Sequence, residues 1–166
     1  TPGENGLLQG YFDMIQIPYS GCDVLPSALT FNKFACNQYL KGFGVRVAES
    51  MMIRMGFEVL NEEIVNKVGL PCFIKPNLGG SSFGISKVKT VEEIQPALEK
   101  AFNEAPEVVV EAYMEGTEVT CGCYKTSDKE VILPLTEVVT NNEFFDFDAK
   151  YNGQSDEITP ARISED

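Results

Sequence analysis

Residues 72–88 read CFIKPNLGGSSFGISKV, and this stretch decides the fold. The apolar run at 72–76 predicts a strand, the glycines and serines of 77–84 predict a loop, and the remaining residues predict a returning strand. Glycines let backbone amides point into one concavity, and the hydroxyls of Ser81 and Ser82 add further donors. Such a loop is suited to bind phosphate oxygens.

Two familiar phosphate-binding motifs do not fit this loop. Ile85 stands where a Walker loop requires lysine, and the flanking strands are not those of a dinucleotide fingerprint. Lys75 nevertheless favours phosphate, because an ammonium on an apolar strand beside the loop would clamp an anion. The alternatives are an ordinary hairpin turn and a lysine on the solvent side of an edge strand.

The rest of the chain mixes helical and strand-like patterns. We expect Ser27, Asn61 and Thr90 to cap the second, third and fourth helices. Apolar spacing predicts helices over 7–16, 28–41, 62–68 and 91–104, and strands over 108–113, 117–125 and 130–139. Residues 45–48 are expected to be a short strand or an extended segment. Residues 140–160 are expected to be mostly loop. The order hairpin, helix, strand, hairpin predicts an α+β fold rather than a doubly wound parallel sheet.

Composition excludes several classes of function. The chain has 166 residues, a net charge of −12, and neither histidine nor tryptophan. Histidine-based metal sites and Ser-His or Cys-His catalysis are therefore excluded within it. The acidic balance argues against a nucleic-acid partner, and no apolar run is long enough to span a membrane. Any anion must be bound locally, against the overall field.

The cysteines are odd in number, and we expect them to be small, reduced core residues rather than metal ligands. The five are Cys22, Cys36, Cys72, Cys121 and Cys123. A zinc site would need closer pairs on two arms and further ligands.

Polar side chains elsewhere are weaker candidates when each is taken alone. Glu111 ends one expected strand and Glu118 begins the next, where carboxylates can accept hydrogen bonds from an exocyclic amine and ribose hydroxyls. Lys33 lies in a helix between apolar neighbours, and Lys150 and Tyr151 lie in the late polar loop. The alternatives are solvated strand ends, a solvated helix lysine and a packing tyrosine.

Taken together, these segments resemble the D-alanine–D-alanine ligase family over essentially the whole chain. The segments that carry the resemblance are GENGLLQG at 3–10, IPYSG at 17–21, SALTFNK at 27–33, IKPNLGGSSFGISKV at 74–88 and FDAKY at 147–151. The resemblance implies an ATP-grasp fold, with this chain as the central ATP-clamping subdomain and an incomplete flanking region. We expect residues 1–42 to join an N-terminal domain to it, 43–140 to form that subdomain, and 141–166 to form a mobile active-site loop and the start of a truncated C-terminal subdomain.

The resemblance also implies an activity. The family is cytoplasmic and makes D-alanyl-D-alanine for peptidoglycan. ATP phosphorylates the carboxylate of the first D-alanine, the amine of the second attacks the acyl phosphate, and phosphate leaves. Phosphoryl transfer depends on positioning and charge stabilisation rather than on a protein nucleophile, which suits a chain without histidine. We therefore expect ATP and Mg²⁺ (or Mn²⁺), with metal ligands outside this chain, D-alanine as substrate, and a parent homodimer.

Site residues are implied position by position. Lys33 and Lys75 match ATP-phosphate lysines, and Gly80 and Ser82 belong to the matching glycine-rich loop. Ser81 and Tyr151 match two members of a catalytic hydrogen-bond triad. Nucleotide contacts are implied for Lys150 beside that tyrosine, Glu111 on the adenine side, the hinge from Ala112 to Met114, and the ribose glutamate Glu118.

The sequence departs from the family pattern at two positions. Asn32 stands where the family usually has Asp, and Ala112 stands where some members have Lys. Because the hinge contacts adenine partly through its backbone, the second departure need not abolish binding. The sequence around Lys150 resembles that of the dipeptide-forming type, and D-serine stays open as second substrate. We expect this chain alone not to ligate. The alternatives are another ATP-grasp carboxylate–amine ligase and a non-catalytic nucleotide-binding module.

Overall fold

The computed structural model describes residues 2–140 and 155–164. Two compact units can be distinguished, Thr1–Tyr113 and Met114–Asp166, and each is described by itself. Lys150 and Tyr151 lie outside the described residues. The segment boundaries predicted at 42/43 and 140/141 stay predictions.

The N-terminal unit is built on a four-stranded antiparallel sheet with strand order β1-β4-β2-β3. Its strands are β1 (Ser50–Arg54), β2 (Cys72–Pro76), β3 (Ser86–Val88) and β4 (Glu107–Ala112). The strand–loop–strand prediction around the glycine-rich loop is confirmed, because β2 and β3 pair in register from Cys72 opposite Val88 to Ile74 opposite Ser86. Residues 45–48 are not a strand, since they lie outside any regular element and the first strand begins at Ser50.

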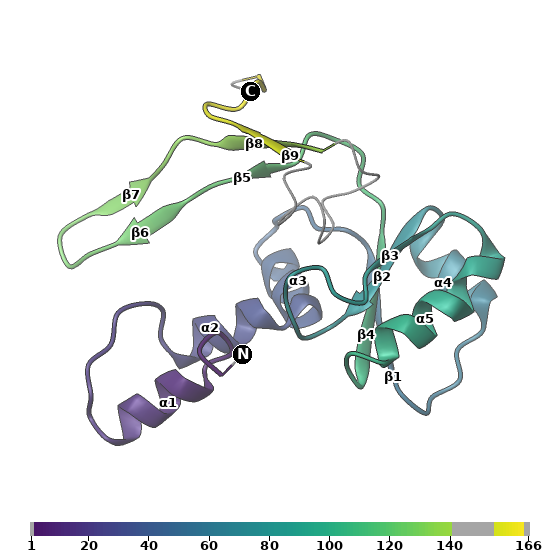
Figure 1. The fold of residues 1–166 in the computed structure, drawn as a ribbon, viewed down its shortest axis with the longest axis horizontal. Helices are drawn as coiled ribbons and strands as arrows, with labels where there is room; N and C mark the ends of the chain where they lie inside the picture. Colours follow the sequence, from purple (N-terminus) through teal and green to yellow (C-terminus); the bar gives the residue numbers. More distant parts are fainter. Residues whose placement is uncertain (1, 141–154, 165–166) are drawn as a thin grey trace. The chain divides into compact units, whose positions relative to one another are not determined.

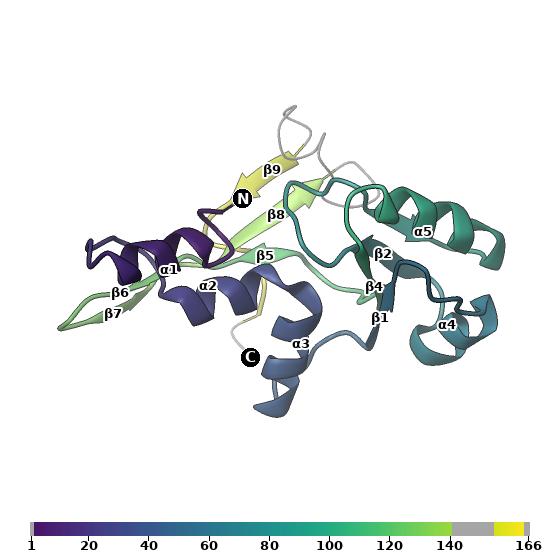
Figure 2. The same cartoon turned by 90° about the horizontal axis from the view of Figure 1, so that it is seen from below.

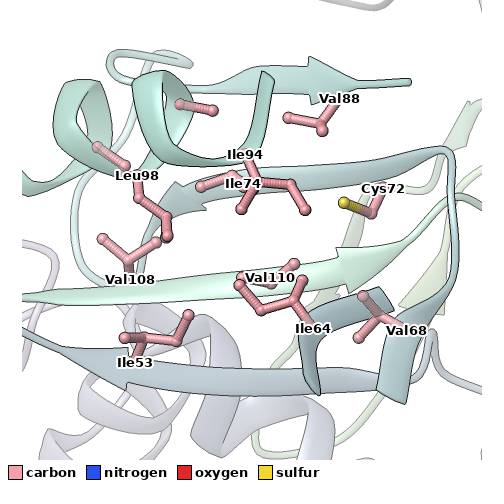
Figure 3. Close-up of a cluster of buried hydrophobic side chains, with 12 residues drawn as sticks. Ile53, Ile64, Val68, Cys72, Ile74, Val88, Ile94, Leu98, Val108 and Val110 are labelled. Carbon is pink, nitrogen blue, oxygen red and sulfur yellow. The ribbon is translucent and has the colours of Figure 1, made fainter. Parts of the chain in front are cut away.

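Helices α4 (Asn61–Val68) and α5 (Ile94–Phe102) cover one face of this sheet (Figures 1 and 2). Both are amphipathic, and β2 alternates buried and half-buried residues, so one side of each element faces the core. Ile74, Ile94 and Val110 are fully buried there (Figure 3). Burying each such side chain contributes about 1.5–3 kcal/mol, which makes this layer the rigid platform of the unit.

Helix starts differ in detail from the sequence predictions. The structure begins α4 at Asn61 itself, with Leu60 as its N-cap residue, so the predicted Asn61 cap is wrong. Thr90 does precede its helix, but the first turn is a 3₁₀ turn, Val91–Glu93, which leads into α5. Glu93 accepts a hydrogen bond from the Thr90 N–H in a capping box.

The helix predicted over 28–41 is in fact two helices. They are α2 (Val24–Phe31) and α3 (Lys33–Gly42), preceded by α1 (Leu7–Met14). Asn32 leaves the helical conformation, with φ −91° and ψ 100°, and its Oδ1 accepts the Ala35 N–H at 2.9 Å. A side-chain cap therefore starts a new helix where the apolar spacing had predicted a continuous one.

The C-terminal unit contains more strands than predicted. The two long strands are each split, into β5 (Val119–Thr120) and β6 (Cys123–Lys125), and into β7 (Glu130–Ile132) and β8 (Thr136–Thr140). The turn between β6 and β7 is confirmed. A further strand, β9 (Ser155–Ile158), pairs with β8 inside the stretch expected to be loop. Among the described residues no helix is long and apolar enough to cross a membrane.

An ion pair inside the C-terminal unit holds the chain after β9 against β8. Glu137 on β8 accepts hydrogen bonds from the Arg162 guanidinium at 2.8 and 2.9 Å, and from its backbone N–H. The Arg162 side chain beside it lowers the pKa of the Glu137 carboxyl below its ordinary value of 4.5. Arg162 thus holds the chain after β9 against Glu137 of β8.

The core prediction for the cysteines is wrong for three of the five. Cys72 is fully buried under the helices, and its burial raises the pKa of its thiol to about 11. Cys36 is half-buried, whereas Cys22, Cys121 and Cys123 are exposed. Cys121 precedes β6 and Cys123 begins it, and all three residues of β6 are exposed, so strand-like sequence did not imply burial there.

Candidate functional site

A partly buried ion pair lies on the sheet face opposite α4 and α5. Because β2 alternates, Lys75 points away from the core that buries Ile74, and its Nζ lies 2.5 Å from Oε2 of Glu111 on β4. The two side chains are only 20% and 11% exposed. Lys75 is therefore not a lysine on the solvent side of an edge strand, and Glu111 is not a solvated strand end. A charged pair in a low-dielectric position is a costly arrangement, typical of functional sites.

Helix α3 supplies the wall on this side of the sheet. Asn37 donates from Nδ2 to Oε1 of Glu111 at 2.9 Å. Lys33 lies one turn earlier on the same helix, and its Nζ donates to the carbonyl oxygen of Gly79 at 2.9 Å. The helix thus places Lys33 against the glycine-rich loop and Asn37 against the ion pair. Lys33 is not the solvated helix lysine of the alternative interpretation.

The glycine-rich loop has an unusual backbone. Ser81 and Ser82 adopt left-handed conformations, with φ of 53° and 59°. Such conformations cost about 1–3 kcal/mol for each residue that is not glycine, and they concentrate at ligand-binding loops. Gly84, with φ +70°, packs so closely that an added Cβ would lie 2.9 Å from Glu104 Cγ. The loop is therefore anchored at Gly84, while a Cβ at Gly80 would meet nothing within 4 Å.

An aromatic and cationic cluster continues the same face toward β3. Phe73 lies directly opposite Glu111 in the register, and its ring centroid is 6.1 Å from that of Tyr113. The Lys87 Nζ lies 4.1 Å from the Tyr113 ring centroid. A flat apolar surface beside a carboxylate suits a planar heterocycle with an exocyclic amine.

The remaining predicted residues are only partly placed by the structure. Ala112 ends β4 directly after Glu111, so it adjoins the site. Met114 and Glu118 belong to the C-terminal unit, where the Glu118 carbonyl oxygen accepts the Val138 N–H at 2.9 Å. The structure thus brings together Lys33, Lys75, Glu111 and the start of the loop.

Sequence reasoning missed two asparagines of this site. Asn37 follows Lys33 by four residues, a spacing that places both on one helix face and could have found it. Asn77 is fully buried at the end of β2, and no sequence signal distinguishes it from an ordinary loop asparagine. Its partners, Phe34 and Glu107, are far from it in sequence.

Comparison with known proteins shows to which family the chain belongs. The family model described as D-ala D-ala ligase C-terminus matches residues 39–166, which is most of the chain. The chain belongs to the D-alanine–D-alanine ligase family. D-alanine–D-alanine ligases of Phocaeicola vulgatus and Porphyromonas gingivalis W83 are 73% and 54% identical to it over its whole length. The chain spans about half the length of these curated relatives, 51% in each case.

Solved structures of ligases agree with this assignment. VanG D-Ala:D-Ser ligase from Enterococcus faecalis superposes with a TM-score of 0.84 at 37% identity, covering 98% of this chain and 48% of that one. D-alanyl-alanine synthetase A from Vibrio cholerae gives 0.85 at 27%, covering 99% and 51%. A Bacillus anthracis ligase complexed with ATP gives 0.76 at 28%, covering 94% and 48%. The predicted family and α+β ATP-grasp fold are confirmed.

Proposed function

We propose that this chain is the ATP-binding portion of a D-alanine–D-alanine ligase, which joins two D-alanines with conversion of ATP to ADP and phosphate for peptidoglycan synthesis. The observation that carries the proposal is the partly buried Lys75–Glu111 pair, which adjoins the glycine-rich loop on the face that also receives Lys33. Two ammonium groups beside a loop of backbone donors form a local anion site in a chain of net charge −12.

The proposed roles follow from the geometry and the family. Lys33 and Lys75 would neutralise phosphate oxygens, and the amides of Gly80 and Ser82 would donate to them. Glu111 holds Lys75 on one oxygen and Asn37 on the other, and each carboxylate oxygen can accept a further hydrogen bond. It would use that capacity toward the adenine amine.

The other family contacts belong to the same proposal. The hinge from Ala112 to Met114 and the ribose-binding Glu118 would complete the nucleotide site. Ser81 would act with Tyr151 in the hydrogen-bond triad, beside Lys150. These roles are carried over from the family sequence pattern, and Tyr151 and Lys150 lie outside the described residues.

Mg²⁺ or Mn²⁺ would accompany ATP and neutralise its phosphate charge. In the described part of the chain no three His, Cys, Asp or Glu side chains are grouped closely enough to hold a metal ion. We therefore assign no metal ligand to the described residues and derive no step through the ion. Cytoplasmic location and a homodimeric parent complete the proposal.

The decisive experiment measures D-alanine-dependent ADP release by the full-length protein that carries this sequence. We expect release with D-alanine, its loss in Lys75→Ala, and its retention in Lys67→Ala, which changes an exposed lysine of α4. D-serine is tested as second substrate, because the VanG protein at 37% identity is a D-Ala:D-Ser ligase. Release with other carboxylate–amine pairs only would indicate another ATP-grasp ligase. ATP binding without release would indicate a non-catalytic module.

A further inference from the structure

We propose that Asn77 is a positioning residue that holds Lys33 and the start of the glycine-rich loop in a fixed relation for binding nucleotide phosphates. This inference rests on the proposed function. Asn77 is a fully buried polar residue at the point where β2 becomes the loop, and nothing in the proposed site so far requires it.

Asn77 caps helix α3 from a distant part of the sequence. The first amides of a helix have no partner within the helix and need an acceptor from elsewhere. Here the Lys33 N–H donates to the Asn77 backbone carbonyl at 3.2 Å, and the Phe34 N–H donates to Asn77 Oδ1 at 3.0 Å. The next amide, that of Ala35, is satisfied by Asn32. Asn77 therefore supplies the acceptors for the first two of these three amides.

The same residue fixes the loop and the lysine side chain. The Lys33 Nζ lies 3.5 Å from the Asn77 carbonyl oxygen and 2.9 Å from that of Gly79, so both ends of Lys33 are tied to this segment. On its other side, Asn77 donates from its backbone N–H to the Glu107 carbonyl at 2.8 Å and from Nδ2 to Glu107 Oε2 at 3.0 Å. The side-chain amide thus joins α3 to β4 at the point where the loop begins, and the backbone carbonyls of Asn77 and Gly79 hold Lys33 there.

This arrangement has a consequence for ligand selectivity. If Asn77 only filled the core, its loss would lower stability and would weaken every ligand of the folded chain equally. If it positions Lys33 and the loop, its loss would weaken ligands that carry phosphates and spare those that do not. ATP and adenosine are therefore the discriminating probes.

The test measures binding of Mg-ATP and of adenosine to the full-length protein that carries this sequence by calorimetry, together with amide hydrogen exchange without ligand. We expect Asn77→Ala to weaken ATP about tenfold, to leave adenosine unchanged, and to speed exchange of the Phe34 amide by a similar factor. The matched control is Asn66→Ala, an exposed asparagine of α4, which should change none of these.

A rescue experiment separates geometry from simple loss of packing. Asn77→Asp keeps the Oδ1 acceptor for the Phe34 N–H but places a carboxylate against that of Glu107, so it should also weaken ATP binding. Adding Glu107→Gln replaces that carboxylate by an amide, whose N–H can donate to the new carboxylate at position 77. This second change should recover most of the lost affinity for ATP. Rescue by this second change would be unexpected for a residue that only fills space.

The inference is overturned if Asn77→Ala leaves ATP affinity unchanged, or if ATP and adenosine weaken to the same extent. It is also overturned if exchange at Phe34 does not change. Failure of the unaltered full-length protein to bind Mg-ATP would overturn the proposed function and the phosphate role of Asn77 with it. The exchange data would still report, without nucleotide, whether Asn77 caps the helix.

Discussion

The Lys75–Glu111 pair should be energetically coupled, and a double-mutant cycle measures that coupling. Its Nζ and Oε2 atoms are 2.5 Å apart, and the side chains are 20% and 11% exposed. Glu111→Gln would leave the lysine ammonium facing a neutral amide, and Lys75→Met would leave the carboxylate with the neutral Asn37 amide as a hydrogen-bond donor. Each single change leaves a partly buried charge without its counter-charge.

The expected magnitude follows from this partial burial. A hydrogen bond to a charged group is worth about 1.5–3 kcal/mol, and removing one partner of a fully buried pair costs about 3–5 kcal/mol. For a pair that water still reaches, we expect each single variant to lower the free energy of unfolding by about 2–3 kcal/mol. The double variant should lose less than the sum, which gives a coupling of about 2 kcal/mol.

The assay is urea-induced unfolding followed by circular dichroism, because the chain has no tryptophan for fluorescence. A matched cycle on the exposed pair Lys125 and Glu130, whose side chains are 76% and 69% exposed, should give only about 0.2–1 kcal/mol. A coupling at Lys75 and Glu111 no larger than this control would refute the reasoning. The pair would then be an ordinary surface ion pair.

Three further predictions test other parts of the structure. Gly84→Ala should cost about 1–3 kcal/mol of stability, because φ is +70° and the new Cβ would lie 2.9 Å from a neighbouring side chain. Gly80→Ala should leave stability unchanged, because its Cβ would meet nothing within 4 Å. Equal effects of the two changes in thermal melts would contradict this. Since the pKa of Glu137 is lowered below 4.5, its ion pair stabilises the fold above that pH and the contribution is lost as pH falls through the lower folded value. Arg162→Met should therefore flatten the acid end of the stability–pH curve, and an unchanged curve would count against the pair. Cys72 is buried and the pKa of its thiol is raised to about 11, so it should react with a disulfide reagent only on unfolding, while the three exposed thiols react at once. Rapid reaction of a fourth thiol, located to Cys72 by peptide mapping, would contradict this and show that the core around Cys72 opens.

Local patterns predicted the sheet region well because its signals are short-range. The apolar run at 72–76, the glycines and serines of 77–84 and the residues after them predicted strand, loop and strand, and β2 and β3 have that order. The sequence also placed Lys75 on this strand beside the loop, whereas the face on which its side chain lies came only from the structure.

The errors arose where a distant contact overrides local spacing. Asn32 ends one helix and caps the next, so the apolar period across it is misleading. The partner of Asn77 on α3 is 43 residues away, and that of Glu111 on α3 is 74 residues away. Composition and periodicity carry no record of such pairs, so the site residues could be nominated but their network could not.

The central claim is that Lys33 and Lys75 face the phosphates of a bound nucleotide. An ATP analogue with an acyl group on its terminal phosphate tests this directly, because a nearby lysine amine attacks the acyl carbon, forms an amide and releases ATP. Peptide mapping of the treated protein then identifies each acylated lysine. We predict labelling of Lys33 and Lys75 that excess Mg-ATP suppresses, over a low, unsuppressed background at the exposed Lys41 and Lys67. Equal labelling of all four, unaffected by ATP, would contradict the account.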